Sequence, residues 1–204
     1  MLSSSLRPCQ LRIATLANST VYKVTHDTQC SHPCYLSQIE CDVPWRPRSG
    51  CSQWFTGVTG TLQSYNFAGG QHLANQDYSI CIREEAGYCN IQYTADTFKV
   101  SMGLNPPTTT VSTASKVGVL TCSTVDYVYI PLGGAIAGAE ANSNLFCGGI
   151  LAPATAITTN TAVKTSEKPF QIHVRFDGSE VETGVTEVGA TDIGFQIKYV
   201  QTGC

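Results

Sequence analysis

The densest group of side chains able to do chemistry is Cys30-Ser31-His32-Pro33-Cys34, in which two thiols and an imidazole stand close together in the chain. Thiolate and imidazole groups are the usual ligands of zinc. Further ligands of the right type are not obvious, and cysteines in an oxidising compartment form disulfides instead. We therefore prefer a structural disulfide turn over a zinc site for this segment.

Catalytic groups are sparse. The chain has four histidines, His26, His32, His72 and His173, and none stands beside a second histidine at metal-binding spacing. The motifs Gly-x-Ser-x-Gly and His-Glu-x-x-His, which carry a hydrolytic nucleophile or a catalytic zinc, are missing, and so is the Gly-Asp-Ser-Gly-Gly of trypsin-like proteases. His173 sits in an apolar run and is interpreted as structural. The sequence predicts a protein that is not an enzyme.

Composition narrows the class of protein further. Of the 204 residues only 13% are charged, and the net charge is -3. A chain so poor in basic residues lacks the surface that binds phosphates, so nucleic acid is not expected as a partner. No run approaches the roughly 18 apolar residues of a membrane span. Ten cysteines in such a chain indicate disulfides and a secreted, extracellular protein.

The elements that must position these residues are short strands. Apolar and polar residues alternate in runs rich in β-branched and aromatic types, and clusters of Gly, Pro, Asn or Thr separate the runs. No stretch keeps a helical period for a full 12 residues with caps at both ends. The pattern predicts an all-β fold, an antiparallel β-sandwich. The expected strands include residues 60–67, 90–94, 97–102, 126–130, 170–176 and 194–200.

Three stretches lack a strand period and are expected to be long loops, namely residues 105–116, 133–139 and 152–168. Loops of this length are often functional or mobile, and they are also tolerated as surface insertions. The second of them is small and apolar, which would favour association if it is exposed. It could equally pack against its own sheet.

A Pro-rich linker at residues 43–50 divides the chain into an N-terminal extension, residues 1–42, and a main domain, residues 51–204. The extension is too short to close a core alone. The segment that begins at Met1 has no apolar stretch long enough for a signal peptide. Because a disulfide-bonded protein must be exported, we expect the sequence to belong to a longer precursor.

The extension and the main domain echo each other weakly. Cys9 and Cys89 each open a strand-like run, and Cys41 and Cys204 each follow a strand that contains Gln. If the echo reflects a repeat, the natural bridges are Cys9 to Cys41 and Cys89 to Cys204.

Several segments of the main domain resemble the CUB domains of secreted arthropod proteins. The resemblance spans residues 51–204 and implies a CUB-like jelly roll stapled by disulfides. Residues 1–42 look like the remnant of a preceding CUB-like module, since Ser37-Gln38-Ile39-Glu40-Cys41 resembles the end of such a module. The residues that carry the resemblance are Cys51-Ser52-Gln53-Trp54-Phe55-Thr56-Gly57, residues 60–67 and 72–83, Gly87-Tyr88-Cys89, Cys122 with residues 126–131, Phe146-Cys147-Gly148, Pro169-Phe170 and residues 194–199.

The resemblance also implies a disulfide pairing. It joins Cys51 to Cys81 and Cys122 to Cys147, with Cys89 to Cys204 as the extra bridge of this subgroup. Four cysteines then remain in the extension, and they allow three pairings. By analogy with the repeat we favour Cys9 to Cys41 and Cys30 to Cys34.

Many CUB domains bind calcium through one Glu and two Asp in loops at one end of the sandwich. Asp126 resembles one of these ligands, and Asp177 is a loose match for another. The position of the Glu falls near Ser101, which is not acidic. The resemblance thus leaves a weak calcium site at Asp126 and Asp177, and the preferred alternative is that Asp126 accepts hydrogen bonds in a loop. We expect no other cofactor.

The remaining features concern surfaces. Asn18-Ser19-Thr20 is an acceptor sequence for N-glycosylation, so Asn18 is expected to carry a glycan in an exposed loop. Trp54, Phe55, Tyr65 and Tyr78 are either interface anchors or core residues.

The resulting hypothesis is a secreted, non-catalytic CUB-domain protein that binds an extracellular protein or glycan in an extracellular assembly. Two alternatives stay open. One is a self-associating structural component of a coat, filament or matrix, which would be a homo-oligomer. The other is a regulatory fragment of a larger secreted trypsin-like protease.

Overall fold

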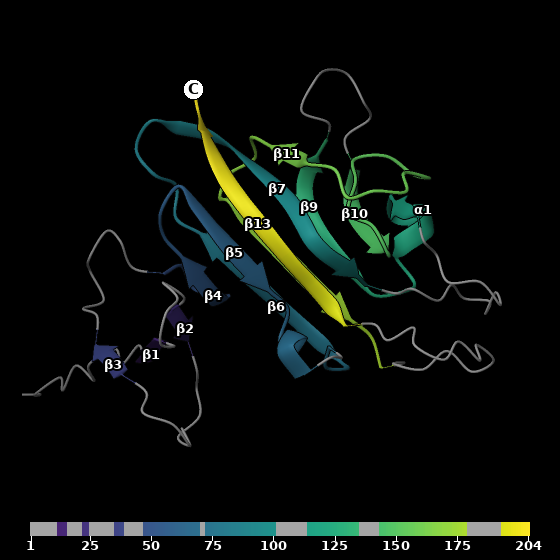
Figure 1. Ribbon diagram of the computed structural model, residues 1–204. Coiled ribbons are helices and arrows are strands. Elements are labelled where there is room, and N and C mark those ends of the chain that lie inside the picture. The colour runs from purple at the N-terminus through teal and green to yellow at the C-terminus, as the bar shows by residue number, and fades with distance from the viewer. Residues whose placement is uncertain are drawn as a thin grey trace, which may run out of the picture.

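The computed structural model describes residues 47–69, 72–100, 114–134, 143–178 and 193–204, together with the backbone of three short strands within the first 38 residues. These residues form two β-sheets that pack face to face (Figure 1). The predicted all-β sandwich is therefore confirmed. The described helices are the 3-10 turn η1 (Phe67–Gly69) and the single α-helical turn α1 (Val119–Cys122), and neither is long or apolar enough to cross a membrane.

The larger sheet has nine strands in the order β3-β1-β2-β4-β6-β12-β9-β10-β8, and the smaller has four in the order β11-β7-β13-β5. Neighbouring strands are antiparallel except β4 and β6, which run parallel. The strands of the larger sheet are β1 (Arg12–Thr15), β2 (Tyr22–Val24), β3 (Tyr35–Gln38), β4 (Cys51–Phe55), β6 (Gln76–Ile82), β8 (Ser115–Val117), β9 (Tyr127–Gly133), β10 (Ser143–Gly148) and β12 (Gln171–Phe176). Those of the smaller sheet are β5 (Thr59–Gln63), β7 (Tyr88–Lys99), β11 (Val163–Thr165) and β13 (Gly194–Gly203).

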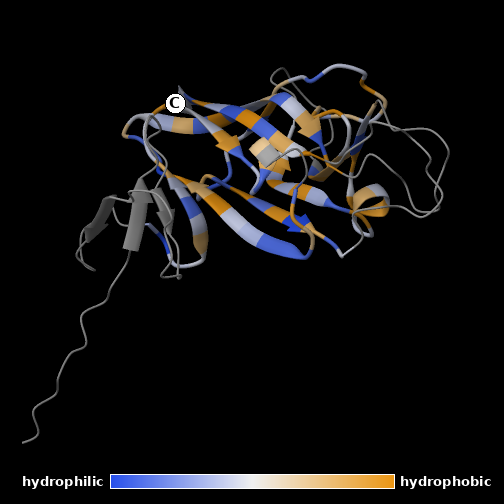
Figure 2. Cartoon of the chain, turned by 60° about the horizontal axis from the view of Figure 1, so that its bottom comes forward, coloured by the Kyte–Doolittle hydropathy of each residue, from blue (hydrophilic) through white to orange (hydrophobic). Residues whose placement is uncertain are grey.

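The core lies between the two sheets, and the two-residue period of the strands fills it. Along β12 the side chains of Ile172, Val174 and Phe176 are buried, while those of His173 and Arg175 face away from the core. Figure 2 shows the same alternation of apolar and polar residues along other strands. The largest fully buried side chains are aromatic or branched, and they include Tyr93, Tyr199, Phe98, Phe146, Phe170 and Phe195.

Three disulfides join elements of the main domain. Cys51 of β4 is bonded to Cys81 of β6, Cys122 of α1 to Cys147 of β10, and Cys89 of β7 to Cys204 at the last residue of the chain. These are the three pairs that the resemblance to CUB domains implies. Cys9, Cys30, Cys34 and Cys41, like Asn18, lie outside the described residues, so their pairing and glycosylation remain predictions.

Two of the expected loops contain strands. Residues 163–165 form β11, which pairs with β7, and Ser115 begins β8 instead of belonging to a loop that reaches Lys116. Each strand is only three residues long, and a strand that short has no period to detect. Residues 105–113 and 135–139 of the expected loops lie outside the described residues.

The three N-terminal strands belong to the larger sheet. Strand β2 pairs antiparallel with β4, with Tyr22 opposite Trp54 and Lys23 opposite Gln53. The three strands β1 to β3 therefore continue the larger sheet beyond β4.

The Cys51 to Cys81 bridge closes a loop of 30 residues and fixes the parallel pair β4 and β6. We expect the double variant Cys51→Ala, Cys81→Ala to lose about 3 kcal/mol of the free energy of unfolding, because the open chain gains entropy when unfolded. Denaturant unfolding of both proteins measures this. A variant whose midpoint stays within error of the natural chain would show that the bridge does not constrain the fold.

Candidate functional site

Asp126 lies immediately before β9, at one end of the sandwich, and only 4% of it is exposed. One carboxylate oxygen, Oδ1, accepts a hydrogen bond of 2.6 Å from the backbone N–H of Asp177. The other, Oδ2, lies 3.2 Å from Nε2 of His72. The structure therefore brings Asp126 and Asp177 together, but Asp177 contributes its backbone to the contact.

His72 is the residue that occupies the space beside Asp126. Its side chain is fully buried, and its ring lies against the ring of Phe176 with 3.9 Å between the centroids. Gly194 makes room for this arrangement. It has a positive φ of 88°, and a Cβ there would overlap the Ser64 hydroxyl and approach the Cβ of His72.

A second cluster lies on the side of the larger sheet that faces away from the core. Six outward-facing side chains of β6, β12 and β9 form it, and we call this cluster the outer face. Cross-strand register sets its arrangement, because His173 lies opposite both Ser79 and Tyr129, and Arg175 lies opposite both Asp77 and Tyr127. The outer face consists of Asp77, Ser79, Tyr127, Tyr129, His173 and Arg175.

A short polar chain runs through the outer face. Ser79 Oγ lies 3.1 Å from His173 Nδ1, and Asp77 Oδ1 lies 3.0 Å from His173 Nε2. In a serine hydrolase the nucleophile contacts Nε2 and a buried carboxylate contacts Nδ1. In this protein Ser79 contacts Nδ1 and Asp77 contacts Nε2, and 68% of the Asp77 side chain is exposed. These contacts orient the imidazole and do not activate Ser79.

The outer face is bordered by two of the disulfides. Trp54 packs with Cys51 and Cys81 beside β6, while Tyr127 and Tyr129 pack against Cys122, Cys147, Val125 and Leu145. Groups built on strands and held on both flanks by covalent links are well suited to present a fixed surface.

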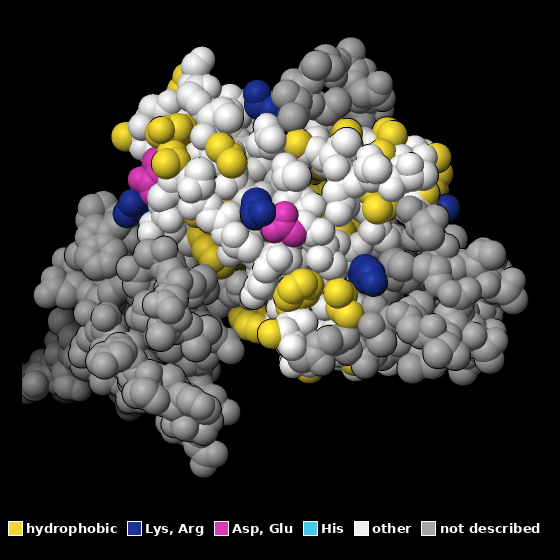
Figure 3. Space-filling model, viewed as in Figure 1, with side chains coloured by type: hydrophobic (Ala, Val, Ile, Leu, Met, Phe, Trp, Pro, Cys, Tyr) yellow, Lys and Arg dark blue, Asp and Glu magenta, His cyan; other side chains and the backbone are white. Residues whose placement is uncertain are grey.

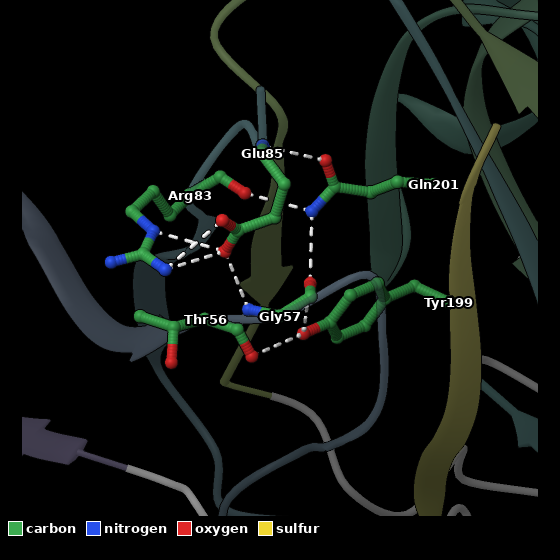
Figure 4. A network of polar contacts seen from close by, with 6 residues as sticks. All are labelled: Thr56, Gly57, Arg83, Glu85, Tyr199 and Gln201. Atoms are coloured by element: carbon green, nitrogen blue, oxygen red, sulfur yellow. Dashed lines mark hydrogen bonds and ion pairs between the residues drawn. The ribbon is translucent and has the colours of Figure 1, made fainter. Parts of the chain in front are cut away.

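A third polar cluster ties the opposite end of the sandwich together (Figure 4). Glu85 Oε1 accepts a hydrogen bond of 2.7 Å from the Gly57 N–H, and its carboxylate pairs with Arg83. The side-chain amide of Gln201 donates to the carbonyls of Gly57 and Arg83, and the Tyr199 hydroxyl donates to that of Thr56. The cluster joins the β4–β5 turn to the segment after β6 and to β13, which is a structural role.

Burial and charge shift the pKa of two groups in this cluster. Partial burial alone would raise the pKa of the Glu85 carboxyl, but the Gly57 N–H and the Arg83 guanidinium outweigh it and hold the pKa below its ordinary value. Burial, helped by the Glu85 charge and opposed by Arg83, raises the pKa of Tyr199 to about 12. Tyr199 is therefore a neutral hydrogen-bond donor at physiological pH.

A family model described as the animal CUB domain matches residues 48–202. The chain belongs to the animal CUB domain family. Among solved structures, a chain with the CUB1-EGF-CUB2 domains of rat MASP-1 is similar at 14% identity with a TM-score of 0.43, covering 73% of this chain and 42% of that one. A MASP-1 CUB2 domain bound to Ca2+ is similar at 19% identity with a TM-score of 0.35, covering 72% of this chain and 96% of that one. No curated protein matches the chain.

The aromatic residues considered as anchors of this CUB domain are mostly interior. Trp54, Phe55 and Tyr78 are buried, and Tyr65 is half-buried against the core. Burial and the charge interaction with Tyr65 raise the pKa of Tyr78, although the hydrogen bond that its hydroxyl accepts from the Tyr65 backbone N–H opposes this. Interpretation of the sequence missed the outer face and assigned His173 a structural role. The i, i+2 spacing of Tyr127 and Tyr129 places both side chains on one side of the sheet. Only the register of β9 with β12 shows that Arg175 and His173 lie beside them.

The described residues of this CUB domain do not bring together the ligands that a calcium ion needs. Calcium requires six to eight oxygen ligands. One oxygen of Asp126 accepts the Asp177 N–H and the other lies 3.2 Å from an imidazole nitrogen, so both are already engaged within the chain. Within the described ranges no group of three His, Cys, Asp or Glu is placed to hold a metal. The position near Ser101 lies outside those ranges.

We therefore expect thermal unfolding to be insensitive to calcium. About 5 mM CaCl2, above the concentrations at which extracellular modules bind the ion, should give the same Tm as EDTA. Differential scanning calorimetry measures both conditions, with Asp126→Asn as the control. A rise of several degrees with calcium in the natural chain, absent from the control, would establish a calcium site here.

Glu85 should make stability depend on pH in one direction. Its folded pKa is lowered, so its contribution is present above the unfolded value of about 4.3 and is lost as the pH falls through the folded value. Glu85→Gln should therefore lower the free energy of unfolding by about 1 kcal/mol at pH 7. The difference between the variant and the natural chain should become smaller below about pH 4.5.

Urea unfolding at several pH values tests this expectation. The neighbouring Glu84→Gln is the matched control, because Glu84 pairs with Lys168 on the surface, where both side chains are 43% exposed. Two results would contradict the role assigned to Glu85. One is an equal loss of stability in the two variants at pH 7, and the other is a loss in Glu85→Gln that does not change with pH.

Proposed function

We propose that this CUB domain is secreted and non-catalytic, and that it binds another extracellular protein through the outer face. CUB domains are typically extracellular protein-binding modules. The three disulfides fit an oxidising compartment, where such bonds persist.

The observation that carries the proposal is the composition of the outer face. Tyr and Arg are enriched among the residues that dominate protein interfaces. Two tyrosines of β9 and an arginine and an oriented histidine of β12 stand together on adjacent strands, with their backbones fixed by the register of β6, β12 and β9. A surface already ordered before binding loses little conformational entropy when a partner docks.

The opposite side of the sandwich offers a less suitable surface. Figure 3 shows that the side formed by the smaller sheet is mostly uncharged, with a basic and an acidic side chain in contact near its middle. Lys198 Nζ lies 2.9 Å from Asp96 Oδ1, so this charge is compensated within the chain. Thr and Gln dominate the outward positions of β5 and β13, which is typical of a solvated sheet face.

Self-association is the second candidate, as in a coat, filament or matrix. It is favoured by α1, where 60% of Val119 and all of Leu120 are exposed beside the Cys122 to Cys147 bridge. Light scattering over a wide range of concentrations distinguishes the two candidates, because a strictly monomeric protein at high concentration would argue against self-association.

A bulky charge in the middle of the outer face should abolish binding without unfolding the domain. We propose Ser79→Arg as the disrupting variant and Thr94→Arg, at an outward position of β7 on the smaller sheet, as its matched control. Tagged proteins are incubated with extracellular fluid from the source tissue, and captured proteins are quantified by mass spectrometry.

We expect Ser79→Arg to lose at least about nine-tenths of the specifically captured protein, as a tenfold weaker complex would, while Thr94→Arg retains it. Circular dichroism establishes that both variants are folded. Equal capture by both, or loss only with Thr94→Arg, would place the binding surface elsewhere.

A further inference from the structure

We propose that Arg175 docks a carboxylate side chain of the partner protein, and that His173 keeps Arg175 available by holding Asp77 away from it. This inference rests on the proposed function and names the chemistry of the same surface.

The strand register gives the Asp77 carboxylate two possible partners, Arg175 and His173. Arg175 and Asp77 lie directly opposite each other on the antiparallel pair β12 and β6, and opposite charges in that position normally attract. Asp77 instead pairs with its diagonal neighbour, since Asp77 Oδ1 lies 3.0 Å from His173 Nε2. Ser79 contacts Nδ1 on the other side of the ring at 3.1 Å and fixes the orientation of the imidazole.

Arg175 is left with an uncompensated charge. Its side chain is exposed, and the part of the chain that the structure describes gives its guanidinium no hydrogen-bond or ion-pair partner. The carboxylate of Asp126, the residue before β9, is buried and is engaged by the Asp177 N–H and His72. The neighbour across the strand on the far side is Tyr127, which adds an aromatic surface beside the cation.

A single carboxylate fits this arrangement better than a polyanion. A guanidinium binds a carboxylate through two parallel hydrogen bonds, which gives directional recognition. Sulfated glycans carry many charges and are held by clusters of cations. Arg175 is the one permanently charged cation of the outer face, so we assign it an Asp or Glu side chain of a protein, with apolar parts of the same segment on Tyr127 and Tyr129.

The first test uses a phage-displayed library of random dodecapeptides selected on the full chain. We expect the enriched peptides to share an Asp or Glu at one position and to shift the Arg175 Nε–Hε resonance in NMR titrations. Arg175→Gln should weaken the best peptide by about tenfold, which equals about 1.4 kcal/mol. Arg48→Gln, which removes the same charge from an exposed position outside this surface, should leave the affinity within about twofold.

The second test separates the positioning role of His173 from a direct contact. His173→Val frees Asp77 to neutralise Arg175, so it should weaken the same peptide by about fivefold, about 1 kcal/mol. Adding Asp77→Asn removes the competing charge, so the double variant should recover to within about twofold of the natural chain. If His173 only touched the ligand, the double variant would stay as weak as His173→Val.

The remaining outcomes decide between this inference and the proposed function. Enriched peptides that bind the outer face without a shared acid, or heparin oligosaccharides that shift Arg175 at lower concentrations than any peptide, would overturn the inference. So would a library that yields no peptide on the outer face. The proposed function would still stand if Ser79→Arg abolished capture of extracellular protein. If Ser79→Arg left capture unchanged, both the proposed function and the inference about Arg175 would be wrong.

Discussion

The register of β6, β12 and β9 is the constraint on which the rest of the structure depends. Because side chains alternate between the two sides of a sheet, the same three strands bury Ile80, Val174 and Val128 on one side and present the outer face on the other. A slip of one residue would exchange the two sets and place His173 and Arg175 in the core. The Cys51 to Cys81 bridge fixes β6 relative to β4, so it opposes a slip of β6 and supports the surface as well as the core.

Much of the fold follows from local pattern, and most of the site does not. Alternation of apolar residues and the ordered cysteines predict the sandwich and the family, since both are properties of the linear sequence. The contact between His72 and Asp126 joins positions 54 residues apart in different loops, and no local pattern indicates it. The competition between His173 and Arg175 for Asp77 likewise exists only once β12 is aligned with β6.

The aromatic residues of β4 show the reverse case, in which a local pattern suggests a surface and tertiary packing removes it. Phe55 joins the main core, and Trp54 covers the Cys51 to Cys81 bridge on the other side of the sheet. A strand that is covered on both sides has no exposed face, so its apolar residues are all buried. The short strand β11 is explained similarly, because pairing with β7 orders a segment whose own sequence has no strand period.

The pairing of β2 with β4 affects how easily one molecule can associate with another through its sheet edge. In the main domain alone, β4 would end the larger sheet with a row of free backbone donors and acceptors, and such a border recruits strands from other molecules. The chain's own N-terminal hairpin shields that border. Proteolytic removal of the N-terminal strands would expose the backbone edge of β4. Molecules could then associate by pairing these edges, one copy after another.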